Sequence, residues 1–159
     1  AARVYAIDVG YGQLDWKLRN DPRVVVMERT NARYLERLAE AVHIATIDVS
    51  FISLGLIMPR VVGWLRPAGQ VVALVKPQFE AGRNEVGKGG VVRDPAVHRR
   101  VLERIADVAT TLGLGLCGLM PSPLLGPAGN REFLGWWRLG AVHTDTAATI
   151  ASCLEEIVG

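Results

Sequence analysis

Six short apolar segments alternate along the chain with segments whose apolar residues recur every three or four positions. Short continuous apolar runs are typical of buried strands, and the 3.6-residue period is typical of helices. The predicted strands are 4–7, 24–27, 44–47, 70–75, 114–120 and 133–139. Strands that alternate with helices predict a parallel, doubly wound α/β sheet. The last two strands have too short a connection for a crossover helix, so they should pair antiparallel.

The helical period predicts helices over 13–19, 31–42 and 52–65, with Pro59 kinking or restarting the third. Asp94 and Pro95 are typical of an N-cap and a first helical position, so a long helix should begin there. Thr144 is predicted to cap a final helix. Residues 66–69 indicate a turn, and 77–93 form a glycine-rich connection longer than usual, which favours a functional or mobile segment.

The chain has 159 residues and a net charge of +2, so it suits one domain, and only a local basic patch could bind a polyanion. No apolar run approaches the roughly 18 residues of a membrane helix. Cys117 and Cys153 lack metal spacing and are interpreted as buried, reduced thiols of a cytosolic protein. His43 and His143 are interpreted as structural, and no metal site is predicted. The abrupt start, without Met, favours a piece of something larger.

Three charged residues, Asp48, Lys76 and Glu132, each stand at the edge of an apolar run. Ligands bind at the strand ends of open α/β sheets. Only three of the 18 basic residues are lysines, and a lysine, unlike an arginine, can lose its proton when buried and act as a base. The spacing alone is equally compatible with an ordinary ion-paired cluster at a sheet edge.

Two acids follow the first two strands. Asp8 suits the two hydroxyls of a ribose, as acids at strand ends do in nucleotide sites, although it could instead cap the following turn. Glu28 closes the second strand and could help to hold an adenosine. Trp136 and Trp137 alternate across the last strand, so one should be buried and the other exposed.

Five motifs occur in one order along the chain. They are Ala6-Ile7-Asp8-Val9-Gly10-Tyr11-Gly12-Gln13-Leu14, Ile47-Asp48-Val49-Ser50-Phe51-Ile52-Ser53, Val75-Lys76-Pro77-Gln78-Phe79-Glu80, Gly87-Lys88-Gly89-Gly90-Val91-Val92-Arg93-Asp94-Pro95 and Gly126-Pro127-Ala128-Gly129-Asn130-Arg131-Glu132-Phe133. In this order they resemble the TlyA/hemolysin A family of S-adenosylmethionine-dependent RNA methyltransferases, which have an FtsJ-like catalytic domain. The resemblance runs from residue 1 to about residue 139.

The resemblance implies 2′-O-methylation of ribosomal RNA, in the cytoplasm, by a Lys-Asp-Lys-Glu tetrad. By motif position, Asp48, Lys76 and Glu132 resemble its last three members, with Lys76 as the candidate base. Asp8, with Glu28 and Asp48, would then belong to the S-adenosylmethionine site.

The RNA, alone or in a ribosomal subunit, is the implied partner. Ser50 and Phe51 could contact or stack on the target nucleotide, although Phe51 could equally belong to the core. Arg83, Lys88 and Arg93, among glycines of the long connection, could contact phosphates, unless the segment is a plain solvated loop.

The family sheet has the order 3-2-1-4-5-7-6, with strand 7 antiparallel, so the six predicted strands resemble strands 2 to 7. The first strand, the glycine-rich cofactor turn, the first lysine of the tetrad and a small RNA-binding domain are expected before residue 1. We therefore expect an N-terminally truncated domain over 1–159, with two open inner sheet edges that a partner, a swapped segment, a rearranged sheet or a homo-oligomer would cover.

Without the first lysine, Lys76 would face two carboxylates and stay charged. The chain alone is therefore expected to bind S-adenosylmethionine poorly and to be inactive. The alternative function is a non-catalytic RNA-binding or assembly module. A membrane-active hemolysin is disfavoured because the most amphipathic helix, at the C-terminus, carries Asp145, Glu155 and Glu156 rather than a basic face.

Overall fold

The computed structural model of the chain describes residues 1–142 and 145–157. The strands are β1 (Val4–Ile7), β2 (Val24–Met27), β3 (Val42–Ile47), β4 (Leu65–Val75), β5 (Leu114–Pro121) and β6 (Phe133–Leu139). The helices are α1 (Trp16–Arg19), α2 (Leu54–Val62), α3 (Pro77–Glu80), α4 (Pro95–Thr111) and α5 (Thr146–Glu155). Short 3-10 turns cover Ala32–Tyr34, Arg83–Glu85 and Pro127–Gly129.

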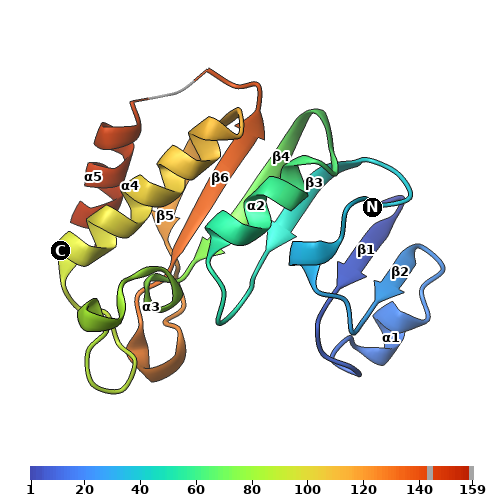
Figure 1. The fold of residues 1–159 in the computed structure, drawn as a ribbon, viewed down its shortest axis with the longest axis horizontal. Coiled ribbons are helices and arrows are strands. Elements are labelled where there is room, and N and C mark those ends of the chain that lie inside the picture. Colours follow the sequence, from blue (N-terminus) through green and yellow to red (C-terminus); the bar gives the residue numbers. More distant parts are fainter. Residues whose placement is uncertain (143–144, 158–159) are drawn as a thin grey trace.

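The strands form two sheets rather than one. Four strands pair in the order β3-β4-β6-β5, with β3 parallel to β4 and β6 antiparallel to both of its neighbours. The other two, β1 and β2, pair with each other in parallel and lie beyond β3 (Figure 1). This arrangement confirms the predicted order, with the last strand antiparallel. In the part of the chain that the structure describes, no strand pairs with the inner edge of either β1 or β3.

The core lies between the four-stranded sheet and the helices α2, α4 and α5, which Figure 1 shows together on one face. Along β4, residues 71, 73 and 75 are buried under these helices, whereas residues 72 and 74 are only half-buried. The same alternation occurs in β6, where Trp137 is 2% exposed and Trp136 is 42% exposed. The predicted division of the two tryptophans is therefore confirmed.

The long helix α4 begins as predicted. The Asp94 carboxylate accepts a hydrogen bond from the Ala96 amide at 2.8 Å, and Pro95 occupies the first turn. Val97, Val101 and Ile105 form its buried stripe. The last helix, α5, is capped by Asp145, whose side chain accepts from the Ala148 amide. Thr144, the predicted cap, and His143 lie outside the described residues.

The predicted helix over 31–42 is wrong, because only Ala32–Tyr34 form a single 3-10 turn. Side chains from other elements take hydrogen bonds to the backbone of this segment. The Arg60 guanidinium donates to the Arg33 carbonyl at 3.1 Å, and the Arg66 guanidinium donates to the Ala41 carbonyl at 3.1 Å. The Arg33 carbonyl is one that a helix would use internally, so its contact with Arg60 competes with the local helical period.

Other boundaries shift by a few residues. Helices α1 and α2 are shorter than predicted, and α2 continues through Pro59. The predicted turn over 66–69 lies inside β4 as an irregularity, where the register to β3 shifts and Ala68 takes a φ of 58°. The connection 77–93 contains α3, a 3-10 turn and a bridge between Gly87 and Val91, so it is a structured segment.

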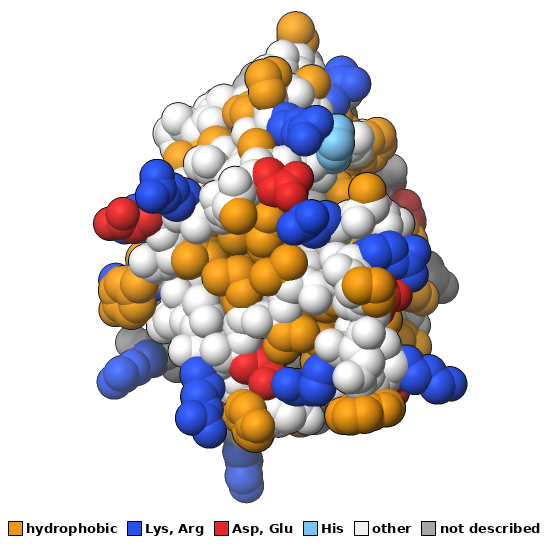
Figure 2. All heavy atoms as spheres, turned by 90° about the vertical axis from the view of Figure 1, so that its right-hand side faces the viewer, with side chains coloured by type: hydrophobic (Ala, Val, Ile, Leu, Met, Phe, Trp, Pro, Cys, Tyr) orange, Lys and Arg blue, Asp and Glu red, His pale blue; other side chains and the backbone are white. Residues whose placement is uncertain are grey.

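The two-stranded unit leaves apolar surface partly uncovered. Every residue of β2 is apolar, yet all of them are only half-buried. Figure 2 views the molecule from the side on which α1 and β2 lie, and hydrophobic side chains gather near the centre of this face, ringed by charged ones. Trp16 of α1 and Tyr11 are among the exposed hydrophobic residues of the chain.

A glycine of β6 makes room for the buried tryptophan. A Cβ at Gly135 would lie 2.0 Å from the Trp137 ring, a severe overlap in a packed core. We predict that Gly135→Ala lowers the free energy of unfolding by about 1–3 kcal/mol, measured by urea titration. The matched control is Gly118→Ala on β5, where the new Cβ would meet Trp136 at 3.5 Å. Equal effects of the two substitutions would contradict this packing argument.

Candidate active site

Three strand ends meet at one edge of the four-stranded sheet. The carboxyl ends of β3 and β4 lie side by side because these strands are parallel, with Ile47 opposite Ala73. Strand β6 runs the other way, so its first residue, Phe133, pairs with the last residue of β4, Val75. The antiparallel register therefore brings Glu132, just before β6, to the level of Lys76, just after β4.

Lys76 is the polar centre of this edge. Its ammonium nitrogen lies 2.7 Å from Asp48 Oδ1 and donates a hydrogen bond to Ser50 Oγ at 3.1 Å. The Lys76 side chain is only 12% exposed, whereas that of Asp48 is 72% exposed. The lysine stem is therefore fixed by packing, and its charged end is held by a carboxylate that faces solvent. An ammonium has three donors, and these two contacts leave one available.

Glu132 is buried, and its partner is an amide rather than the lysine. Gln78 Nε2 donates to Glu132 Oε1 at 2.8 Å, and Glu132 is 5% exposed. Gly126 packs against the same carboxylate, because a Cβ there would lie 2.2 Å from Glu132 Oε1. The predicted trio is thus brought to one edge, but only Asp48 and Lys76 form an ion pair. Gln78 belongs to the motif that carries Lys76, yet its role is not evident from sequence.

Glu80, which sequence reasoning missed, connects the segments that carry Asp48 and Lys76. Its buried carboxylate accepts from Ser53 Oγ and from the Leu54 amide, both at 2.7 Å. Arg104 of α4 forms an ion pair with the same carboxylate at 3.1 Å. Glu80 therefore holds the first turn of α2 against α3. The only sequence signal was an acid at the end of an apolar motif, which usually indicates a surface residue.

Phe51 is exposed rather than part of the core. The side chain is 89% exposed, and its backbone φ of 62° lies in the left-handed region that non-glycine residues rarely adopt. Its ring contacts Phe79 at a centroid distance of 4.8 Å, and Lys76 Nζ lies 6.0 Å from the Phe79 ring. The alternative that Phe51 is a core residue is therefore wrong. The two rings form an aromatic surface beside the lysine.

Asp8 and Glu28 stand at the same edge of the β1–β2 pair. Asp8 Oδ1 accepts from the Gly10 amide at 2.6 Å, and the exposed Asp8 has no other side-chain partner among the described residues. Glu28 Oε1 accepts from the Gly12 amide at 2.7 Å and pairs with Arg19. The Arg19 hydrogen bond lowers the pKa of Glu28. Asp8 thus keeps a free oxygen, whereas Glu28 holds the loop that follows β1.

The three basic residues predicted to contact RNA are all exposed. Arg83, Lys88 and Arg93 lie along the 77–93 segment and have no ion-pair partner in the described ranges. Glu85 pairs with Arg100 of α4, which anchors the segment between Arg83 and Lys88. The segment is therefore held to α4 by an ion pair, which a plain solvated loop would lack. No direct contact joins these side chains to the Asp48–Lys76 pair.

Comparison with known proteins identifies the class. Residues 1–139 match the FtsJ-like methyltransferase family, and the chain belongs to this family. Its fold also occurs in the methyltransferase NodS of Bradyrhizobium japonicum, solved with S-adenosyl-L-homocysteine, at a TM-score of 0.59 and 14% identity. That similarity concerns the fold alone.

Among curated proteins, the chain is 49% identical over 160 residues to the 16S/23S rRNA (cytidine-2′-O)-methyltransferase TlyA of Mycobacterium tuberculosis, covering 99% of this chain and 58% of TlyA. It is 55% identical over 137 residues to YqxC of Bacillus subtilis, whose name carries the term rRNA methyltransferase. This match covers 84% of this chain and 49% of YqxC. A solved Streptococcus thermophilus structure with hemolysin in its name superposes at a TM-score of 0.92 and 45% identity. The superposition covers 98% of this chain and 58% of that chain.

The chain spans about half to three fifths of the length of these curated relatives. Hemolysin also names a Brachyspira hyodysenteriae relative that is 39% identical over 137 residues, covering 84% of this chain and 57% of that protein. Within residues 1–142 and 145–157, no helix has the length and apolarity required to cross a bilayer.

The Glu28–Arg19 contact predicts a pH dependence of stability. Because folding lowers the pKa of Glu28, its contribution is present at neutral pH and is lost as the pH falls below the ordinary glutamate pKa of about 4.3. We predict that Glu28→Gln is less stable than wild type at pH 7 and that the difference narrows on acidification, by urea unfolding at several pH values.

The control for this prediction is Glu36→Gln, since Glu36 is exposed and has no ion-pair partner in the described part of the chain. A Glu28→Gln deficit that stays constant from pH 7 to pH 3 would contradict the prediction.

Proposed function

We propose that this domain supports S-adenosylmethionine-dependent methylation of a ribose 2′-hydroxyl in ribosomal RNA. The observation that carries the proposal is the geometry of Lys76, whose ammonium is held by Asp48 and Ser50 beside an exposed aromatic surface. An oxygen nucleophile needs a group that positions it and a group that receives its proton. The uncommitted N–H of Lys76 can position the oxygen, and the same nitrogen can receive the proton once it is a neutral amine. The name of the relative TlyA, an rRNA (cytidine-2′-O)-methyltransferase, supports the choice of RNA and of the 2′-oxygen.

The methyl donor would be held at the edge formed by β1, β2 and β3. Asp8 fits the ribose of an adenosine because it follows a strand and keeps one carboxylate oxygen free. Glu28, on the adjacent strand, supports the loop after β1, and Asp48 follows β3 on the far side. S-adenosylmethionine, when bound, supplies a methyl group on a positively charged sulfur. The exposed Asp48 carboxylate would favour that charge.

The proton path begins at the target hydroxyl. Lys76, once it has released its own proton, accepts the hydroxyl proton as the oxygen becomes a nucleophile. Asp48, 2.7 Å from the same nitrogen, then stabilises the ammonium that forms. Glu132, held by its hydrogen bond from Gln78, orients the residues at this edge of the sheet.

The target nucleotide would lie on the Phe51–Phe79 surface, with Ser50 close to its ribose. RNA bases that are splayed out of a helix commonly stack on aromatic side chains. Arg83, Lys88 and Arg93 would contact phosphates on either side. We infer ribosomal RNA as the substrate from the names of the relatives, and the cytoplasm as the place where the reaction occurs.

Replacing the central lysine tests the chemistry. We predict that Lys76→Met in the full-length protein lowers methyl incorporation into ribosomal RNA by about 10²–10⁴-fold, the usual effect of losing a general base. The matched control is Lys17→Met, because Lys17 is exposed on α1 and its side chain has no ion-pair partner among the described residues. Transfer of a radiolabelled methyl group measures both. RNA binding without transfer by the wild type would instead favour the non-catalytic binding module.

Phe51 offers a test that separates function from stability. A glycine accepts the left-handed φ of 62° without strain, and the exposed ring adds little to the core. We predict that Phe51→Gly unfolds at equal or higher denaturant concentration, while KM for RNA rises about tenfold through lost stacking. Phe51→Tyr should keep KM near wild type. A destabilised Phe51→Gly protein with unchanged KM would contradict the assignment.

A further inference from the structure

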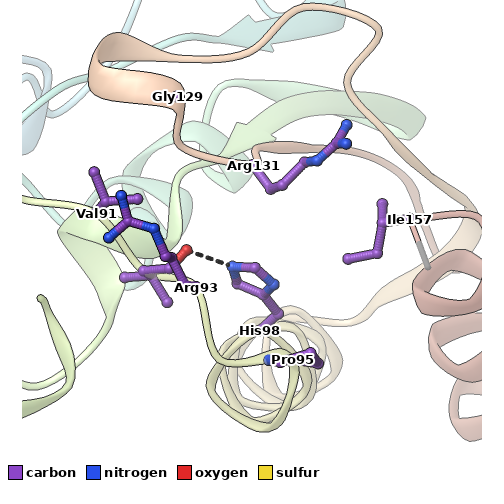
Figure 3. Close-up of a pocket in the computed structure, with 8 residues that line it drawn as sticks. Val91, Arg93, Pro95, His98, Gly129, Arg131 and Ile157 are labelled. Carbon is purple, nitrogen blue, oxygen red and sulfur yellow. Dashed lines mark hydrogen bonds between the residues drawn. The ribbon is translucent and has the colours of Figure 1, made fainter.

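A pocket of about 220 Å³ lies at the start of α4 (Figure 3), and neither Asp48 nor Lys76 lines it. Its walls come from the segment before α4, from the loop that precedes β6 and from Ile157 near the C-terminus. Arg93, His98 and Arg131 supply its charged and polar groups. None of the contacts described for Lys76 or Glu132 involves these three side chains.

His98 presents an acceptor atom without a partner. The residue is 2% exposed, and its Nε2 lies 3.1 Å from the Val92 carbonyl oxygen. A carbonyl oxygen can only accept, so Nε2 carries the hydrogen and Nδ1 of the neutral ring is an acceptor. Burial lowers the pKa of His98, which favours this neutral form. Nδ1 is buried and, among residues 1–142 and 145–157, has no hydrogen-bond partner. Figure 3 shows it turned away from Val92, on the side of the pocket where Ile157 lies.

The surrounding contacts fix the His98 ring. Its edge packs on Phe133 at a centroid distance of 5.5 Å. Asn130, itself buried, accepts from the Val92 amide at 3.1 Å and donates to the Gly90 carbonyl at 2.9 Å. These bonds hold the Val92 carbonyl in place, and the carbonyl holds Nε2. The free acceptor is therefore pre-positioned, and leaving it unmatched carries a desolvation cost that a donor would remove.

Two arginines give the pocket an affinity for anions. Arg93 and Arg131 are exposed and have no ion-pair partner in the described part of the chain. The N-terminus of α4 contributes little to anion binding, because Pro95 has no amide hydrogen and Asp94 already accepts from the Ala96 and Val97 amides. Asp94 also adds a negative charge near His98. An anion would thus bind at the guanidinium groups, while Nδ1 needs a neutral hydrogen-bond donor.

We propose that this pocket binds one nucleotide of an RNA strand, whose 2′-hydroxyl donates to His98 Nδ1 while the phosphates on its two sides pair with Arg93 and Arg131, whose guanidinium groups lie on opposite sides of His98 (Figure 3). The proposal rests on the proposed function, because it assigns a contact to the RNA that this domain would methylate. The 2′-hydroxyl is the group that distinguishes RNA from DNA. The pocket therefore selects RNA at a nucleotide other than the one that receives the methyl group.

The test is fluorescence anisotropy with the full-length protein and no methyl donor. A single-stranded RNA, its 2′-deoxy counterpart and its 2′-O-methyl counterpart serve as probes. We expect RNA to bind about fivefold more tightly than either analogue, the size of one hydrogen bond. His98→Gln keeps a donor for the Val92 carbonyl and leaves no acceptor at the position of Nδ1, because its remaining acceptor, Oε1, lies elsewhere on the side chain, so it should abolish the preference. Arg93→Gln and Arg131→Gln should weaken all probes and reduce the salt slope by about 0.7 each.

Arg99→Gln is the matched control, since Arg99 is exposed on α4 and does not line the pocket. Histidine ¹⁵N spectra give a second readout, in which the His98 Nδ1 signal should shift on adding RNA but not DNA or inorganic phosphate. Equal shifts with all three, or an RNA preference that survives in His98→Gln, would overturn the proposal. A failed methylation assay with the preference intact would count against the proposed function alone.

Discussion

The reversed direction of β6 is the constraint on which the site depends. Because β6 enters antiparallel between β4 and β5, it is the start of β6, not its end, that lies at the carboxyl end of β4. Glu132 is therefore placed at the level of Lys76, although the two residues are far apart in sequence. A parallel strand in this position would carry Glu132 to the opposite edge of the sheet. Trp137 of the same strand is buried under the helices, and Gly135 leaves room for its ring.

Two buried carboxylates, Glu80 and Glu132, turn this topology into a defined geometry. Glu80 joins the first turn of α2 to α3, so the segments that carry Asp48 and Lys76 cannot move independently. Its charge is satisfied by Ser53, the Leu54 amide and Arg104, and losing one hydrogen bond to a charged group typically costs about 1.5–3 kcal/mol. Gln78 plays the corresponding part for Glu132. Asp48 faces solvent, whereas Lys76 and the two carboxylates that fix the neighbouring segments are mostly buried.

Much of this architecture could be predicted from sequence because its signals are local. The apolar runs of the strands, the Asp94–Pro95 start of α4 and the alternation of Trp136 and Trp137 each follow from a pattern within a few residues. The predictions that failed depend instead on contacts between residues far apart in the sequence. The segment 31–42 has a helical period but is not a helix, and its backbone accepts hydrogen bonds from Arg60 and Arg66. Glu80 accepts hydrogen bonds from residues 26 and 27 positions earlier in the chain. Phe51 is ambiguous in the sequence because an aromatic residue beside an apolar run is normally part of the core. Its left-handed backbone and its exposed ring are visible only in the structure.

The position of the transferred methyl group tests the central claim most directly. RNA treated with the full-length protein and S-adenosylmethionine would be digested to nucleosides and analysed by mass spectrometry. A lysine held by Asp48 beside an aromatic surface is suited to a ribose hydroxyl, so the account predicts that fragmentation places the added 14 mass units, about one CH₂, on the sugar. A methyl group found on the base would contradict it.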